Sequence, residues 1–261
     1  MELGTVFRLH SAFAATCGTL AVALPSFFGS VFPSMASPDT LAFIVRVYAV
    51  LLTAQAPLLY GIRQLHGPAL RPFATVYALI FGATAAVCAH SDFVLGVVRE
   101  ENKDFLWVWL GLCAVYIAFA AVPALQKVFR PWSLVHMVSV TAIGVTAIAA
   151  PASCNVRYFL VPNEDAYNTV SRYYGVLILG MSLLAAASTS AAARPAWPAV
   201  RGGLCAMFAA SGACLALYLA ARREQLEPVG IGSLLTFAAM AALYGTARLP
   251  ASPGAAAAKA L

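Results

Sequence analysis

The sequence predicts an all-α polytopic membrane protein whose eight transmembrane helices form two parallel four-helix repeats. Three observations lead to this fold class. The 261 residues are 62% hydrophobic and only 10% charged, whereas soluble domains contain about 25% charged residues. Eight apolar runs follow one another along the chain. The two halves of the sequence also match each other at one fixed offset.

The apolar composition excludes a water-soluble fold of this size, because the surface of such a fold would still need polar side chains. A bilayer core about 30 Å thick requires roughly 20 apolar residues per helix, so the chain has room for about eight helices with short loops. The net charge of +6 does not indicate nucleic-acid binding, since no basic run is longer than Arg222-Arg223. The expected partners are membrane lipids, other membrane proteins or a second copy of the chain, and no nucleic acid.

Each apolar run is expected to form one transmembrane helix. The runs lie at residues 9–28, 41–61, 72–90, 104–124, 132–150, 168–187, 198–220 and 229–247. Proline suits helix starts and the loops just past helix ends, and it marks many of these boundaries. The boundary prolines are Pro25, Pro38, Pro72, Pro131, Pro151, Pro195, Pro198 and Pro228.

The two ends of the chain need separate interpretation. The first run has the basic residue and the apolar stretch of a signal peptide. Its counterpart at 132–150 lies in the middle of the chain, so we interpret both as membrane helices. The low-complexity residues 251–261 are expected to form a disordered cytoplasmic tail.

The loop charges predict the orientation in the membrane. If the termini and the even-numbered connections share one side, that side carries nine basic residues against a single acidic residue, Glu2. The basic residues are Arg8, Arg63, Arg71, Lys127, Arg130, Arg194, Arg201, Arg248 and Lys259. The opposite side carries nine acidic and only five basic residues. Basic residues in short loops stay in the cytoplasm, so both termini are expected to be cytoplasmic.

An internal repeat becomes visible when the sequence is shifted by 126 residues. Residue types that are rare in this chain then coincide without a gap. The matched pairs include His10/His136, Pro25/Pro151, Asp39/Asp165, Arg46/Arg172, Tyr48/Tyr174, Pro72/Pro198 and Cys88/Cys214. A unit of four helices returns the chain to its starting side, so both units should insert in the same direction, related by an axis along the membrane normal.

The match fades after residue 88, which indicates that the fourth and eighth helices have diverged. The predicted units are a first four-helix membrane repeat at residues 1–126 and a second at residues 127–250.

Each unit places an arginine inside an apolar helix, seven residues after an aspartate at the helix start. Seven residues are about two helical turns, so the two side chains share one face. Asp39 and Asp165 can cap free backbone N–H groups. Helical side chains lean toward the helix N-terminus, which directs Arg46 and Arg172 toward the outer interface.

Three interpretations of the arginines stay open. They can anchor their helices at the lipid headgroups. They can face the bundle interior and hold the anionic group of a lipid or a carboxylate. They can form an ion pair with the aspartate of their own unit.

Other polar side chains at matched positions are expected to serve packing. Tyr48 and Tyr174 lie on nearly the opposite face from the arginines, where a hydroxyl can reach a neighbouring helix. His10 and His136 open the first and fifth helices at the cytoplasmic interface, where a solvated anchor is favoured over a proton relay. The small residues at the matched positions Ala49 and Gly175, with small neighbours, permit close helix approach.

The sequence contains no motif for catalysis, metal binding or a cofactor. HExxH, GxSxG and GxxxxGK[ST] are absent, and the six cysteines show no CxxC or Cys/His spacing. No aspartate or glutamate lies at the centre of a predicted helix, which argues against a proton- or sodium-coupled carrier and against a metal-dependent hydrolase.

Two segments on the outer side are expected to contact water or the headgroups. Residues 91–105 mix both signs of charge, as in a solvated loop. Around residues 154–168, Tyr158, Phe159 and Tyr167 suit an interfacial aromatic belt.

Each unit also carries a proline near the end of a small-residue helix, then a loop, then an Arg-x-Tyr-Gly/Ala-x-Leu helix start. These residues are Pro25, Arg46, Tyr48, Ala49 and Leu51, and then Pro151, Arg172, Tyr174, Gly175 and Leu177. The pattern resembles the four-helix membrane proteins typified by tumour protein p53-inducible protein 11, and more loosely the DoxX-like group. The likeness covers about the first two helices of each unit. The chain departs from the pattern by holding two units and by Ala49 in place of glycine.

The resemblance implies a four-helix membrane fold without a defined activity. We therefore expect a non-enzymatic structural or interaction protein of the membrane. The alternative is a transporter or a lipid- or anion-binding protein that uses Arg46 and Arg172 at the repeat interface. A membrane enzyme ranks third.

Overall fold

The computed structural model describes residues 2–26, 38–96, 105–118, 120, 131–155, 165–188, 193–221 and 228–246. Within these residues the structure is helical and contains no strand, which confirms the predicted all-helical class. The long helices are α1 (Leu3–Ala23), α3 (Pro38–Ile62), α4 (Arg71–Ala89), α5 (Phe105–Ile117), α6 (Pro131–Ala149), α8 (Asp165–Ser188), α9 (Trp197–Ala221) and α10 (Pro228–Thr246). Short helical elements are η1 (Gly67–Leu70), the π-helix η2 (His90–Leu95), α7 (Pro151–Cys154) and η5 (Arg194–Ala196).

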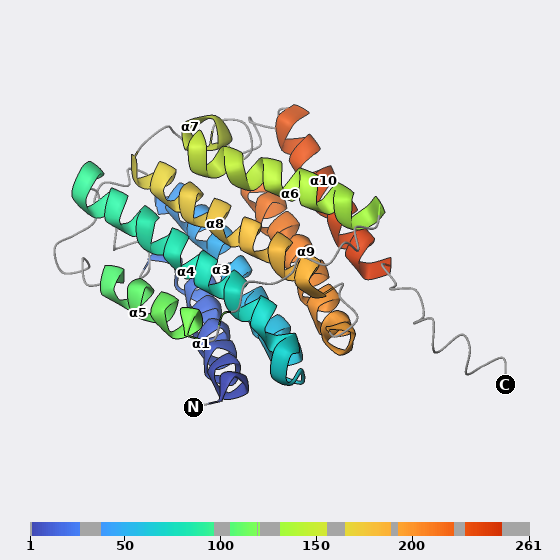
Figure 1. Ribbon diagram of the computed structural model, residues 1–261. Helices are drawn as coiled ribbons and strands as arrows, with labels where there is room; N and C mark the ends of the chain where they lie inside the picture. Colours follow the sequence, from blue (N-terminus) through green and yellow to red (C-terminus); the bar gives the residue numbers. More distant parts are fainter. Residues whose placement is uncertain are drawn as a thin grey trace.

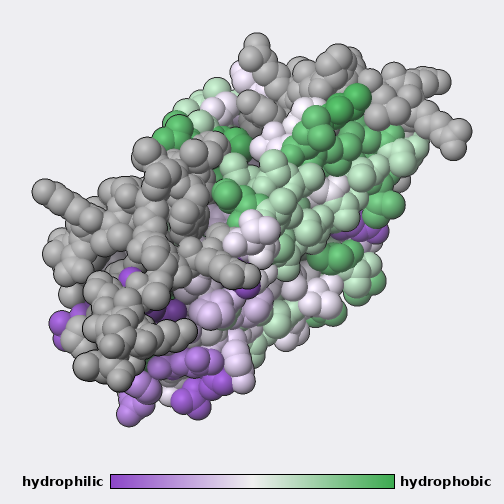
Figure 2. All heavy atoms as spheres, turned by 90° about the vertical axis from the view of Figure 1, so that its right-hand side faces the viewer, coloured by the Kyte–Doolittle hydropathy of each residue, from purple (hydrophilic) through white to green (hydrophobic). Residues whose placement is uncertain are grey.

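Five helical stretches in the described residues are long and apolar enough to cross a bilayer. They are Leu3–Ala23, Ala42–Ile62, Arg71–Leu95, Asp165–Ser188 and Arg194–Ala221. In Figure 2, hydrophobic residues cover much of one face, and hydrophilic residues gather toward one end of it. These features are those of a protein embedded in a membrane.

Proline sets several helix starts, as the sequence predicts. Pro38, Pro131 and Pro228 are the first residues of α3, α6 and α10. Pro72 and Pro198 are the second residues of α4 and α9. A proline costs nothing at these positions, because the first N–H groups of a helix have no carbonyl partner within the helix.

The helices form a bundle in which the two halves of the chain interlock (Figure 1). In the first half α1 packs on α3, and in the second half α6 packs on α8. The third long helix of each half packs against the other half: α4 contacts α8, and α9 contacts α3. Because α3 and α8 also contact each other, these two helices form the centre of the bundle.

The halves share helix boundaries as well as residue types. The first helix ends at Ala23 in one half and at Ala149, 126 residues on, in the other. The next residues, Leu24 and Ala150, leave the helical conformation in the same way, with φ/ψ of −123°/60° and −133°/61°. The same offset separates the ends of α3 and α8 and the starts of α4 and α9.

Glycine allows the first two helices of each half to approach closely. A Cβ atom at Gly18 of α1 would lie 2.6 Å from the backbone nitrogen of Thr53 in α3. In the second half, a Cβ atom at Gly175 of α8 would lie 2.7 Å from the carbonyl oxygen of Gly144 in α6. Backbone atoms cannot yield to such a contact, so the close approach predicted at position 175 is confirmed.

We predict that Gly175→Ala destabilises the protein by about 1–3 kcal/mol, because the added methyl group forces α6 and α8 apart. Gly232→Ala in α10 is the matched control, since a Cβ atom there meets nothing within 4 Å. The control should be neutral or stabilising by up to about 1 kcal/mol through helix propensity. Thermal unfolding in detergent measures both changes, and equal midpoints would contradict the close contact.

Candidate functional site

Each of the paired arginines caps the C-terminus of the first helix of its half, α1 or α6. The Nε of Arg46 donates a hydrogen bond to the carbonyl of Val22 in α1, with an N···O distance of 3.3 Å. The Nε of Arg172 donates to the carbonyl of Ile148 in α6 at 3.4 Å. The last carbonyls of a helix lack partners within the helix, and a cation is favourable at that end. The guanidinium groups therefore stabilise the ends of α1 and α6.

This capping role was not among the three interpretations that the sequence suggested. Arg46 is exposed and Arg172 is half-buried. The Nη1 atom of Arg172 is buried without a hydrogen-bond partner among the described residues. Asp165, the first residue of α8, is exposed, and the side chain of Asp39 lies outside the described residues.

The interpretation of His10 as a solvated anchor is wrong. Its side chain is only 9% exposed, because α4 and α5 cover this part of α1 with aromatic rings. The imidazole Nδ1 is hydrogen-bonded to the hydroxyl of Tyr116 at 2.7 Å, and the ring lies 4.8 Å from that of Tyr77. His10 thus serves polar packing among the rings of α4 and α5. The side chain of His136 is not among those described.

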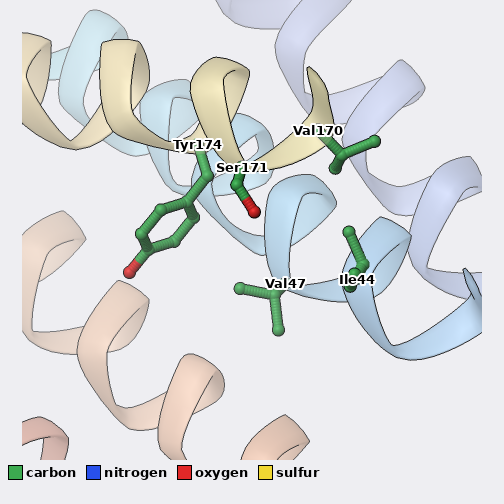
Figure 3. A pocket seen from close by; sticks show the side chains of 5 residues that line it. All are labelled: Ile44, Val47, Val170, Ser171 and Tyr174. Atoms are coloured by element: carbon green, nitrogen blue, oxygen red, sulfur yellow. The ribbon is translucent and has the colours of Figure 1, made fainter. Parts of the chain in front are cut away.

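A small pocket lies between α3 and α8 and is bordered by one of the two matched tyrosines (Figure 3). Its lining residues are Ile44, Val47, Val170, Ser171 and Tyr174. The pocket has room for about one water molecule. The ring of Tyr48 packs instead near that of Tyr173, with the centroids 6.3 Å apart. Both tyrosines therefore serve packing at the α3–α8 interface, and neither arginine lines the pocket.

Buried polar side chains gather on the first turns of α8. The Nδ2 of Asn155, directly after α7, donates to the Oδ1 of Asn168 at 2.8 Å. The hydroxyl of Ser171 donates to the Oδ1 of the same Asn155. All three side chains are at most 9% exposed. This network joins α7 to α8 without leaving the amide of Asn155 exposed.

A second polar group links α8 to the end of α4. We call it the α4–α8 polar seam and define it as Cys88, Ser91, Asp92, Thr169 and Tyr173. The hydroxyl of Ser91 lies 3.1 Å from that of Thr169 and 2.8 Å from the carbonyl of Val87. The thiol of Cys88 donates to the carboxylate Oδ2 of Asp92 at 3.4 Å.

The seam corrects the prediction that residues 91–105 form a solvated loop. The helix of α4 continues into η2, and this extension buries Ser91 and Asp92 at 0% and 4% exposure. Residues 97–104 lie outside the described residues. The prediction that Tyr167 belongs to an interfacial aromatic belt is also wrong, because this side chain is fully buried in α8. Tyr158 and Phe159 lie outside the described residues.

One signal in the sequence could have located these polar groups. At the 126-residue offset, Asn168, Thr169 and Ser171 replace Ala42, Phe43 and Val45 of the first half. These polar residues of α8 therefore lie at positions where the two halves differ. Among the described residues, no group of three or more His, Cys, Asp or Glu side chains lies close enough to hold a metal ion.

Comparisons with protein families, with curated proteins and with solved structures found no match to this chain.

We predict that Arg172→Ala lowers the stability by about 1–3 kcal/mol, the range for a hydrogen bond from a charged group and an unsatisfied partner. The loss should be smaller for Arg46→Ala, because Arg46 is exposed and its bond competes with solvent. Arg8→Ala, at an exposed position of α1, is the control and should unfold like the wild type. If all three variants unfold alike, the capping role does not contribute to stability.

Proposed function

We propose that this chain is an eight-span membrane protein built from two parallel four-helix repeats, and that it acts without catalysis as a structural or interaction protein of the membrane. The relationship to the four-helix proteins typified by tumour protein p53-inducible protein 11 is part of this proposal. It rests on the Arg-x-Tyr-Gly/Ala-x-Leu pattern in the first two helices of each repeat.

The paired arginine caps carry the proposal of two repeats. Donor and acceptor are 24 residues apart in both halves, and each bond has a counterpart at the 126-residue offset. The crossed packing supports the same relation, because an axis that exchanges α3 with α8 also exchanges the α3–α9 contact with the α8–α4 contact. The contact between α4 and α5 in the first half likewise corresponds to the contact between α9 and α10 in the second half.

The use of the polar groups supports a role without catalysis. The capping arginines, the buried histidine and the asparagine network all bind other parts of the protein. The pocket between α3 and α8 is too small for an organic substrate, since small-molecule sites enclose about 300 Å³ or more. The apolar outer surfaces leave lipid and other membrane helices as the natural partners.

Binding of an anionic lipid or carboxylate is the second candidate function. The observation that favours it is the buried Nη1 of Arg172, which has no hydrogen-bond partner in the described part of the chain. An anionic oxygen could accept a charge-assisted hydrogen bond from this group.

A double variant, Arg46→Ala with Arg172→Ala, separates the two candidates. A purely structural role predicts less folded protein in membranes and unchanged binding to vesicles that contain phosphatidylglycerol. An anion site predicts that vesicle binding per folded molecule falls as well. Arg8→Ala again serves as the control for charge alone, and flotation of vesicles with purified protein measures the binding.

We predict that a reporter fused after residue 261 stays in the cytoplasm and that a tag inserted at residue 100 is accessible from outside. The reason is the strong excess of basic residues on the side that holds the termini. Accessibility of the tag to a membrane-impermeant reagent in intact cells measures this. An outward-facing C-terminus would exclude an even number of spans with a cytoplasmic N-terminus.

A further inference from the structure

Three arginines in the described part of the chain lie at the borders of apolar helical stretches. Arg63 follows directly after the stretch that ends at Ile62, and Arg71 and Arg194 are the first residues of two further stretches. The apolar part of a membrane helix matches the hydrocarbon core, so its borders lie at the depth of the lipid headgroups. We call Arg63, Arg71 and Arg194 the arginine rim.

Helix packing brings the arginine rim to one end of the bundle. The end of α3 lies against η5 and the start of α9, where a Cβ atom at Gly61 would lie 3.6 Å from the carbonyl oxygen of Ala196. The start of α4 lies at the same end, because only residues 63–70 connect it to α3. In Figure 1 the starts of α4 and α9 accordingly lie toward the same end of the bundle. Three guanidinium groups therefore belong to one side of the membrane.

The acidic residues of the described part of the chain lie mostly at the opposite end. They are Glu2, Asp39, Asp92 and Asp165. Asp39 lies in the first turn of α3, Asp92 in η2 after the end of α4, and Asp165 at the start of α8. Only Glu2, directly before α1, shares the end that holds the arginine rim. The rim therefore forms a surface with an excess of positive charge.

Arg63 shows most clearly that the rim suits an anion. Its guanidinium carbon lies 3.6 Å from the ring centroid of Tyr60, a side chain that is 55% exposed. Stacking uses the face of a guanidinium group, whereas its N–H donors lie in the plane. Arg63 is half-buried, and its Nε is buried without a hydrogen-bond partner among the described residues. A cation withdrawn from water in this way is stabilised by an anionic oxygen.

The internal repeat does not account for the charges of the rim. At the 126-residue offset, Arg63 corresponds to Thr189 and Arg71 corresponds to Trp197. Trp197 is only 5% exposed at the start of α9, whereas Arg71 is exposed at the start of α4. The third long helix of a half can thus begin with an apolar or with a charged residue. The arginine at the start of α4 therefore has a reason other than the packing of the repeat.

We propose that the arginine rim is a binding surface for the phosphate headgroups of anionic phospholipids. The charge of the surface fits an anion, and its place at the border of apolar stretches fits a ligand that also has acyl chains. Leu79 of α4, about two turns after Arg71, is 58% exposed and offers such chains an apolar contact. The surface goes beyond the structural role proposed above and lies at the end opposite to Arg46 and Arg172. Only its assignment to the cytoplasmic leaflet rests on the proposed orientation.

The test is the thermal unfolding of the purified full-length chain in detergent micelles at constant pH and ionic strength. Phosphatidylglycerol is added stepwise, and phosphatidylcholine, whose headgroup has no net charge, is added in a parallel series. Binding to the native state should raise the unfolding midpoint with the amount of phosphatidylglycerol, as mass action requires. Phosphatidylcholine, and inorganic phosphate at the same concentration, should leave the midpoint unchanged.

Single variants locate the binding surface. Arg63→Ala should raise the amount of phosphatidylglycerol at half-effect by about fivefold, which corresponds to the contribution of about 1 kcal/mol from one basic residue near an anionic surface. Arg71→Ala, at the exposed start of α4, should have a similar effect and keeps the proposal testable if Arg63→Ala does not fold. Arg46→Ala removes the same charge at the opposite end and is the matched control, which should respond like the wild type.

Three results would overturn the lipid surface. The first is a wild-type midpoint that does not depend on phosphatidylglycerol, or that rises equally with phosphatidylcholine or inorganic phosphate. The second is an unchanged half-effect in Arg71→Ala. The third is a loss in Arg46→Ala as large as that in Arg63→Ala, because the effect would then not belong to the rim. None of these outcomes bears on the position of the termini or the stability of the arginine caps, so failure of the lipid surface leaves the proposed function separately testable.

Discussion

The constraint on which this structure depends is that polar groups in apolar helices must be satisfied within the protein. In a bilayer no water is available for this purpose, and lipid supplies no hydrophobic force that drives helices together. Close backbone approach and interhelical hydrogen bonds therefore hold the bundle. Several donors reach a carbonyl of a neighbouring helix: Ser11 to Ala56 at 2.9 Å, Cys113 to Ala78 at 3.3 Å and Cys205 to Ala241 at 3.3 Å.

The arginines meet the same constraint at the places where helices end. The last carbonyls of a helix have no partner within the helix. The chain stops α1 and α6 at matched residues and brings a guanidinium from the following long helix to each end. An arginine that is unexpected in an apolar helix is therefore explained by a neighbouring helix that ends beside it.

The crossed packing gives the two halves a shared core and also lets them differ. Since α4 binds α8 and α9 binds α3, each half completes the other, and neither α3 nor α8 is covered by its own half alone. The two crossed interfaces differ in chemistry. The α3–α9 interface contains the stacked rings of Phe43 and Tyr218, whereas the α4–α8 interface contains the α4–α8 polar seam.

The sequence by itself determined where the helices lie. Apolar runs and boundary prolines predict the long helices of the described residues to within a few residues at most ends, because these features depend only on neighbours along the chain. The tertiary structure alone decided what the polar residues do. His10 is buried and hydrogen-bonded to Tyr116, and Arg46 and Arg172 cap the ends of helices. Asp92 lies in the core, whereas a solvated loop was expected. The physical reason is that the environment of a polar side chain is set by the helix packed against it, and that helix lies far away in the sequence.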